Sequence, residues 1–264
     1  MVHKGTSDSA AYRAKKDFFN SLLTVYGRKP VLEALEDPQT KIYRLHLADS
    51  NRSGDLIERI IAAATAKGAE IVYHDRKALA RISKNSKQDQ GVAADLICAR
   101  YTSHQQFLQS QPGQAPHYTL LALDRITNPQ NLGMIIRSAS AGRIDGILLP
   151  SKGCAPIDPL VIKASAGTVF RAPILRCEDL SSALADFSNS GALAICALSS
   201  HASVSLKDFS PKGPCIYVLG NETEGVSAQV AQHCNQTLKI PMNNGVESLN
   251  VAVTAALIAF RGQV

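Results

Sequence analysis

Apolar and polar residues vary along the first part of the chain in a way that predicts short helices and strands. Three stretches have the apolar spacing or composition of helices: residues 28–36, 54–68 and 76–83. Three others have the length and alternation of strands: residues 41–49, 70–75 and 91–97. Together they predict a compact α/β unit that ends near residue 101.

The second part contains continuous apolar runs of strand length, separated by helical stretches. The runs are residues 119–126, 146–150, 192–198, 215–221 and 238–242. The helical stretches include NLGMIIRSASAGR (131–143) and SLNVAVTAALIAFRG (248–262). This pattern indicates a parallel sheet with helices on both faces, in which ligands bind in loops at the carboxyl ends of the strands.

The segment between these two parts, residues 103–117, is rich in Gln, Ser and Pro, which is typical of a linker. The sequence therefore predicts four parts. They are a disordered basic tail (1–22), a small α/β domain (23–102), the linker (103–117) and a parallel-sheet α/β domain (118–264).

The charge is divided unevenly between these parts. Residues 1–117 hold 17 Lys and Arg against 12 Asp and Glu, whereas residues 118–264 hold 11 against 10. A basic excess in the first half favours a polyanion as partner, because Lys and Arg that face phosphates release counterions on binding.

The cysteine pattern indicates neither a zinc site nor a disulfide framework. The six cysteines are scattered, without a CxxC pair, so we expect reduced, mostly buried thiols and no metal. No apolar run reaches the length of about 18 residues that a membrane span requires, so no membrane association is expected. The amino-terminal segment lacks the apolar core of a signal peptide, which favours a cytoplasmic protein.

The first loop with candidate chemistry is NPQNLG (128–133), which follows a predicted strand. It leads into a helix that would carry Arg137 on its second turn. A polar loop at a helix N-terminus is suited to an anionic or polar ligand. Asn131 could serve such a ligand, or it could be the N-cap of the helix.

Two further loops follow apolar strands. LGNETEG (219–225) contains two glycines, which allow a tight turn and close approach of the backbone to a ligand. IPMNNGVESLN (240–250) ends at a helix start, where Ser248 is expected to be the N-cap and Asn250 to lie in the first turn.

Taken together, NPQNLGMIIRSA, LGNETEGVS and IPMNNGVESLNVAVTAAL resemble the motifs of the SpoU (TrmH-like) family of RNA 2′-O-ribose methyltransferases, within the SPOUT class. The resemblance covers essentially all of residues 118–264. The first domain, with YGRKPVLEAL and QGVAADL, resembles the ribosomal-protein-like substrate-binding domain of ribosomal-RNA members. The most similar branch methylates a guanosine of 23S ribosomal RNA. Thr223 departs from the Gly of many relatives, and Asp89 from the His that ribosomal-RNA members often have.

The resemblance implies a deep trefoil knot in the second domain, a homodimer, RNA as substrate and S-adenosylmethionine as cofactor. It implies that five residues contact or neighbour the cofactor: Leu219, Gly220, Ile240, Met242 and Leu249.

The resemblance also implies a catalytic centre at Arg137, with Asn131, Glu222, Ser248 and Asn250 around it. Because the pKa of arginine lies above about 12, it is a poor general base. We therefore expect Arg137 to bind an RNA phosphate and to polarise the 2′-hydroxyl.

Three alternatives remain open at this point. One is a transfer-RNA ribose methyltransferase, and another is a catalytically silent RNA-binding or ribosome-assembly protein with the same fold. The third, a nucleotide-binding dehydrogenase, is disfavoured because the chain lacks the GxGxxG fingerprint.

Overall fold

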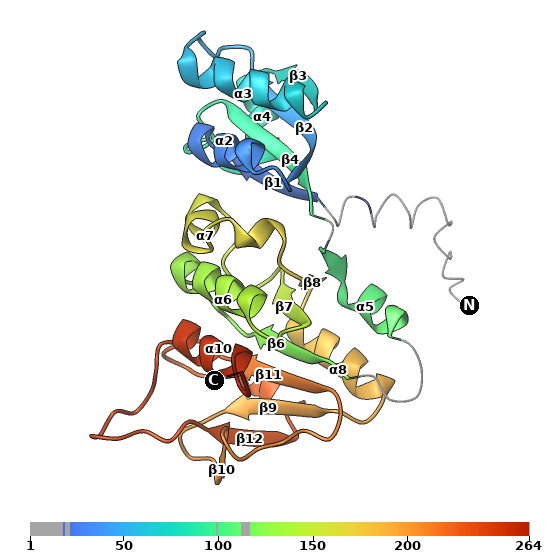
Figure 1. The fold of residues 1–264 in the computed structure, drawn as a ribbon, viewed down its shortest axis with the longest axis vertical. Helices are drawn as coiled ribbons and strands as arrows, with labels where there is room; N and C mark the ends of the chain where they lie inside the picture. The colour runs from blue at the N-terminus through green and yellow to red at the C-terminus, as the bar shows by residue number, and fades with distance from the viewer. Residues whose placement is uncertain (1–17, 19–21, 99, 112–116, 264) are drawn as a thin grey trace, which may run out of the picture.

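The structure is a computed structural model that describes residue 18 and residues 22–98, 100–111 and 117–263. The disordered tail predicted over residues 1–22 lies almost entirely outside the described residues. The described chain forms two α/β layered units, one above the other in Figure 1.

The first unit is a four-stranded sheet in the order β1-β4-β2-β3. Its strands are β1 (Leu22–Tyr26), β2 (Lys41–Ala48), β3 (Glu70–His74) and β4 (Val92–Ile97). β4 is antiparallel to both β1 and β2, whereas β2 and β3 are parallel. The helices are α2 (Arg28–Glu36), α3 (Asp55–Ala66) and α4 (Arg76–Ser83). The three helices and three strands predicted for this region are confirmed, and β1 is an additional strand.

The predicted linker is corrected over residues 103–110. β5 (Thr102–Ser103) pairs in parallel with β8 (Ile174–Cys177), and α5 (His104–Ser110) follows it directly. A capping box between Ser103 and Gln106 begins this helix, so the Gln- and Ser-rich composition encodes a helix start here. The segment therefore packs on the second unit.

The second unit is an eight-stranded sheet in the order β10-β12-β9-β11-β6-β7-β8-β5, and every neighbouring pair is parallel. The strands after β5 are β6 (Thr119–Leu123), β7 (Gly146–Pro150), β8, β9 (Ala194–Leu198), β10 (Val204–Ser205), β11 (Cys215–Leu219) and β12 (Gln236–Lys239). The predicted parallel-sheet α/β class is confirmed. The strand order does not show how the chain threads through its own loops, so the trefoil knot stays a prediction.

Helices cover both faces of this sheet (Figure 1). They are α6 (Pro129–Ala141), α7 (Pro159–Ala164), the 3₁₀ helix η1 (Thr168–Phe170), α8 (Leu180–Ser190), α9 (Ala228–Ala231) and α10 (Val251–Ala259). Alternate residues of β6 separate the two cores: Leu121 and Leu123 pack with α6 and α10, whereas Leu120 and Ala122 pack with α8. The continuous apolar pattern of the strands thus reflects burial on both faces.

Because these strands are parallel, their carboxyl ends lie at one edge of the sheet. The loops after β6, β9, β11 and β12 begin at this edge, and they include all three segments in which the sequence placed candidate chemistry.

Candidate active site

The loops after β9, β11 and β12 enclose a cavity of about 530 Å³. Seven predicted site residues line it: Leu219, Gly220, Glu222, Ile240, Met242, Ser248 and Leu249. All five residues expected at the cofactor are in this set. The loop after β9, with Ser199 and His201, also lines the cavity and was not predicted. The sequence contained a sign of this loop, because the polar residues Ser-Ser-His directly follow the apolar run 192–198.

Gly220 is held in a space that admits no side chain. A Cβ at this position would lie closer than 3.0 Å to the carbonyl carbon of Gly225 and the amide nitrogen of Val226. Asn221 and Gly225 also exchange two backbone hydrogen bonds of 3.0 and 2.9 Å, which fold the loop back over Gly220. Glycine is therefore required here by the loop's own backbone, in addition to any approach to a ligand.

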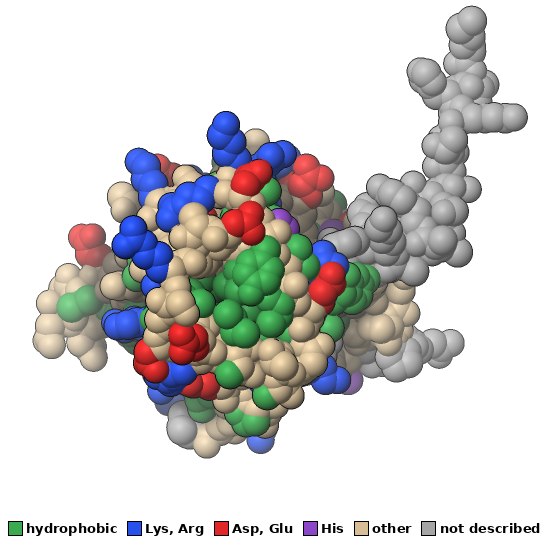
Figure 2. Space-filling view, turned by 90° about the horizontal axis from the view of Figure 1, so that it is seen from above, with side chains coloured by type: hydrophobic (Ala, Val, Ile, Leu, Met, Phe, Trp, Pro, Cys, Tyr) green, Lys and Arg blue, Asp and Glu red, His purple; other side chains and the backbone are tan. Residues whose placement is uncertain are grey.

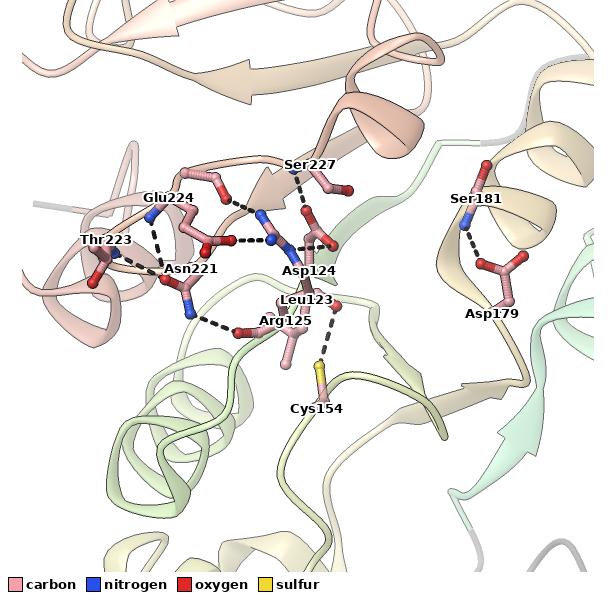
Figure 3. Close-up of polar contacts among 11 residues, drawn as sticks. Leu123, Asp124, Arg125, Cys154, Asp179, Ser181, Asn221, Thr223, Glu224 and Ser227 are labelled. Carbon is pink, nitrogen blue, oxygen red and sulfur yellow. Dashed lines mark hydrogen bonds and ion pairs between the residues drawn. The ribbon is translucent and has the colours of Figure 1, made fainter.

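Side chains of the loop directly after β6 hold this loop in place (Figure 3). The guanidinium of Arg125 donates to the carboxylate of Glu224 and, at 3.2 Å, to the carbonyl oxygen of Gly225. The buried Asp124 accepts a hydrogen bond of 2.6 Å from the amide of Ser227. These contacts join residues about a hundred positions apart in sequence and fix the wall of the cavity.

Asn221 organises the same loop from within. Its Oδ1 accepts from the amides of Thr223 and Glu224 at 2.9 and 3.2 Å, while its Nδ2 donates to the carbonyl oxygen of Arg125 at 3.1 Å. None of Asn221, Asp124 and Arg125 was predicted to belong to the site. The sequence offered one signal for Asn221, its place after the glycine of a strand-to-loop turn.

Three predicted catalytic residues form a chain of hydrogen bonds beside the cavity. Asn131 is 7% exposed; its Nδ2 donates to Oε1 of Glu222, and its Oδ1 accepts from Nδ2 of Asn250 at 3.1 Å. Because Asn131 satisfies an acceptor on one side and a donor on the other, it fixes the orientation of both neighbours. Glu222 lines the cavity, so the buried amide holds a carboxylate at its wall.

Two predicted helix starts are corrected. Asn128, and not Asn131, caps α6, since its side chain accepts from the amides of Gln130 and Asn131. Asn250, and not Ser248, caps α10, accepting from the amide of Ala252 at 2.8 Å. The helix thus begins after Asn250, and Ser248 is free to face the cavity.

Arg137 lies away from these residues. It is exposed on the third turn of α6, not the second, because the helix already begins at Pro129. Its side chain has no hydrogen bond or ion pair to any described residue, and it does not line the cavity of its own chain. The guanidinium is therefore available to an external anion.

Burial raises the pKa of several cysteine thiols. All six are free, and burial raises the pKa of Cys98 and Cys177 to about 12 and that of Cys154 to about 11. Such thiols stay protonated at neutral pH. Within the described residues, no group of three or more His, Cys, Asp or Glu side chains could hold a metal ion. None of the described helices is long and apolar enough to cross a membrane.

A substitution at Asn131 tests the hydrogen-bond chain. Asn131→Asp replaces the donor that faces Glu222 by a carboxylate oxygen, so the two acids repel each other and Glu222 moves. Losing such a buried hydrogen bond costs about 1–3 kcal/mol, and we expect kcat for methyl transfer to fall about tenfold. The matched control is Gln130→Glu, which adds the same charge on an exposed neighbouring residue. Equal kcat values for the two variants would contradict this role.

Comparison with known proteins identifies the class. The model of the SpoU rRNA Methylase family matches residues 118–260, and that of an RNA 2′-O ribose methyltransferase substrate-binding domain matches residues 24–102. An uncharacterized tRNA/rRNA methyltransferase of Mycobacterium avium is 32% identical over 237 residues, which cover 89% of this chain and 75% of that protein. The chain belongs to the SpoU methylase family. More specifically, it is an RNA 2′-O-ribose methyltransferase with a substrate-binding domain.

Solved structures share this architecture. An rRNA methyltransferase from Sinorhizobium meliloti, determined with bound AdoMet, has a TM-score of 0.61 at 25% identity, covering 96% of this chain and 89% of that one. The SpoU methyltransferase AviRb from Streptomyces viridochromogenes, in complex with AdoMet, has a TM-score of 0.61 at 22% identity, covering 96% and 92%, and shows the same fold.

Proposed function

We propose that this protein transfers a methyl group from S-adenosylmethionine to a ribose 2′-hydroxyl of large-subunit ribosomal RNA, at a guanosine. One observation carries the proposal: the five residues expected at the cofactor line a single cavity together with Glu222 and Ser248. The AdoMet bound to the Sinorhizobium meliloti enzyme supports the choice of cofactor.

The residues around the cavity fit this cofactor. Leu219, Ile240 and Leu249 supply apolar walls, and the loop at Gly220 presents main-chain groups without a side chain. A volume of about 530 Å³ lies in the range of roughly 300–1,000 Å³ that is usual for small-molecule sites. The adenosine and methionine parts of S-adenosylmethionine have both apolar surface and polar groups. A cavity lined by apolar side chains and main-chain groups therefore suits this cofactor.

S-adenosylmethionine would supply a methyl group on a sulfonium, ready for in-line displacement by an oxygen. The protein must then align the ribose, accept or pass on its proton, and stabilise the developing negative charge. We assign the charge stabilisation to Arg137, because it is exposed and lacks any partner in the described chain. Asn131 is a positioning residue that holds Glu222 and Asn250, which together with Ser248 would orient the ribose or a bound water.

Arg137 lies outside the cavity of its own chain, which favours a site completed by a second copy. Helix α10 exposes Val253 and Leu257 one turn apart, and Met134 on the packed α6 is 40% exposed. Apolar side chains on adjacent helices are suited to a twofold interface, in which each copy presents the same patch. We therefore propose a homodimer whose α6 helices bring each Arg137 to the partner's cavity.

The choice of ribosomal over transfer RNA rests on the presence of the first domain, which resembles the substrate-binding domain of ribosomal-RNA members. The matching substrate-binding model does not separate the two RNA classes. Asp89, the departure noted in this domain, is 4% exposed and accepts from Ser83 Oγ and the amide of Gly91 at 2.8 and 2.9 Å. Its carboxylate is thus turned into the protein and does not lie on the surface that an RNA would contact.

The test is transfer of a labelled methyl group to unmodified ribosomal RNA and unmodified transfer RNA, followed by mapping of alkali-resistant ribose sites. We expect one labelled guanosine in large-subunit RNA. Label in transfer RNA alone would keep the chemistry and overturn the substrate. If neither RNA is labelled and AdoMet does not bind, a catalytically silent RNA-binding protein would be the better description.

A further inference from the structure

The first domain carries five basic residues along α4 and the loop that follows it. They are Arg76, Lys77, Arg81, Lys84 and Lys87, which we name the α4 basic strip. All five are exposed. Figure 2 looks onto this domain and shows Lys and Arg side chains, with Asp and Glu among them, around an apolar patch.

The strip has no counter-charges of its own. Elsewhere in this domain Arg44 pairs with Glu70 at 2.7 Å and Arg59 with Glu36 at 2.8 Å. In contrast, no residue of the strip forms an ion pair with any part of the chain that the structure describes. Binding an external anion would therefore break no internal ion pair.

The two acids that flank the strip are occupied. Asp75 caps α4 by accepting from the amide of Ala78 at 2.7 Å. Asp89 is buried and bonded to Ser83 and Gly91, as described above. From residue 76 to residue 88 the chain contains no Asp or Glu. Between Asp75 and Asp89, an anionic partner thus meets basic side chains and no acid.

The loop that carries Lys84 and Lys87 is held in a fixed shape. Lys84 ends the helix in the left-handed conformation, at φ 55°, and its amide donates to the carbonyl oxygen of Ala80 at 3.0 Å. Asn85 Nδ2 donates to the hydroxyl of Tyr26 at 3.1 Å, which ties the loop to β1. A surface fixed in advance loses little conformational entropy when it binds.

The strip leads into a groove of about 470 Å³ between the two domains. Lys84, Asn85 and Asp95 of the first domain line one wall, and Asp158 and Arg176 of the second domain line the other. Asp95 accepts from Thr24 Oγ1 and lies 3.1 Å from Nε2 of His46. Arg176 donates to the carbonyl oxygen of Leu22 at 3.0 Å, and its guanidinium lies over the ring of Tyr101. No carboxylate of the described chain forms an ion pair with Arg176. Positive charge therefore lies on both sides of the groove, at Lys84 in the first domain and at Arg176 in the second.

We infer that the α4 basic strip binds the phosphate backbone of the RNA substrate and guides the strand into the groove beside Lys84. The inference rests on the proposed function and specifies which face of the first domain meets RNA. Attraction to the helix dipole accounts for Arg81 in the last turn of α4 and for Lys84 at its C-cap, but not for the other three residues. Unpaired cations in a row are what a polyanion requires, because each contact releases a condensed counterion.

The experiment measures binding of unmodified large-subunit ribosomal RNA to the full chain as a function of salt. The test variant is K77A/R81A/K87A, and the control K41A/R44A/R59A removes the same charge from another part of the same domain. We expect the test variant to bind at least tenfold more weakly near 0.15 M salt and its log–log salt slope to fall by about one for each lost contact. The control should stay within about threefold of the wild type.

Melting temperature and AdoMet affinity should be unchanged in the test variant, because its three residues contact neither the core nor the AdoMet cavity. The control loses two surface ion pairs, each worth less than about 1 kcal/mol, so its melting temperature should fall only slightly and its AdoMet affinity should be unchanged. If the test variant and the control lose equal affinity and slope, the strip is not the RNA surface. This outcome differs from a failure of the proposed function, in which the wild type itself transfers no methyl group to any RNA.

Discussion

Gly220→Ala is expected to lower the affinity for AdoMet by about 10- to 100-fold, because the added Cβ enters the backbone of its own loop. The new atom would lie closer than 3.0 Å to Gly225 and Val226, neither of which can yield as a flexible side chain would. Overpacking of this kind costs about 1–3 kcal/mol, and about 1.4 kcal/mol corresponds to each tenfold loss of affinity. Isothermal titration calorimetry with AdoMet measures the effect directly.

The matched control is Gly213→Ala in the same domain. A Cβ there meets nothing within 4 Å, so the substitution changes the chain by the same atoms without a collision. We expect its AdoMet affinity and its activity to equal those of the wild type. If Gly220→Ala also binds AdoMet with unchanged affinity, the loop over Gly220 does not shape the cofactor site.

The candidate cofactor residues could be named from sequence because their motifs resemble those of the SpoU family. The parallel sheet then brings Leu219, Ile240 and Leu249 to one edge, whatever the details of the loops. The support behind them could not be predicted. The ion pair of Arg125 with Glu224 joins residues far apart in sequence. The local sequence around either residue does not predict this contact.

Helix boundaries failed for a related reason. Ser248 and Asn250 are both good N-caps, and local preference alone does not choose between them. In the structure Asn250 also donates to the buried Asn131, a tertiary contact that adds to its cap and favours this register. By contrast, the start of α5 has a local signal, the capping box of Ser103 and Gln106, while the pairing of β5 with β8 joins residues far apart in sequence.

Arg137→Ala is expected to reduce kcat by about 100- to 1,000-fold, the usual loss when one donor that stabilises developing charge is removed. The exposed side chain has no partner in the described chain, so the melting temperature and the affinity for AdoMet should not change. Arg143→Ala, which removes an exposed arginine just after the same helix, is the control and should remain active. Near-normal turnover of Arg137→Ala would remove Arg137 from the mechanism.

Combining the two variants decides whether Arg137 acts within its own chain or on a partner. In a site shared across a twofold interface, a dimer of one Gly220→Ala chain and one Arg137→Ala chain keeps one intact site, with Arg137 from the first and the cavity from the second. Random pairing makes about half of the dimers mixed, so co-expression should restore about a quarter of wild-type activity. A site contained in one chain predicts no recovery, because every chain then carries one of the two defects. Recovery would thus explain why Arg137 lies outside the cavity of its own chain.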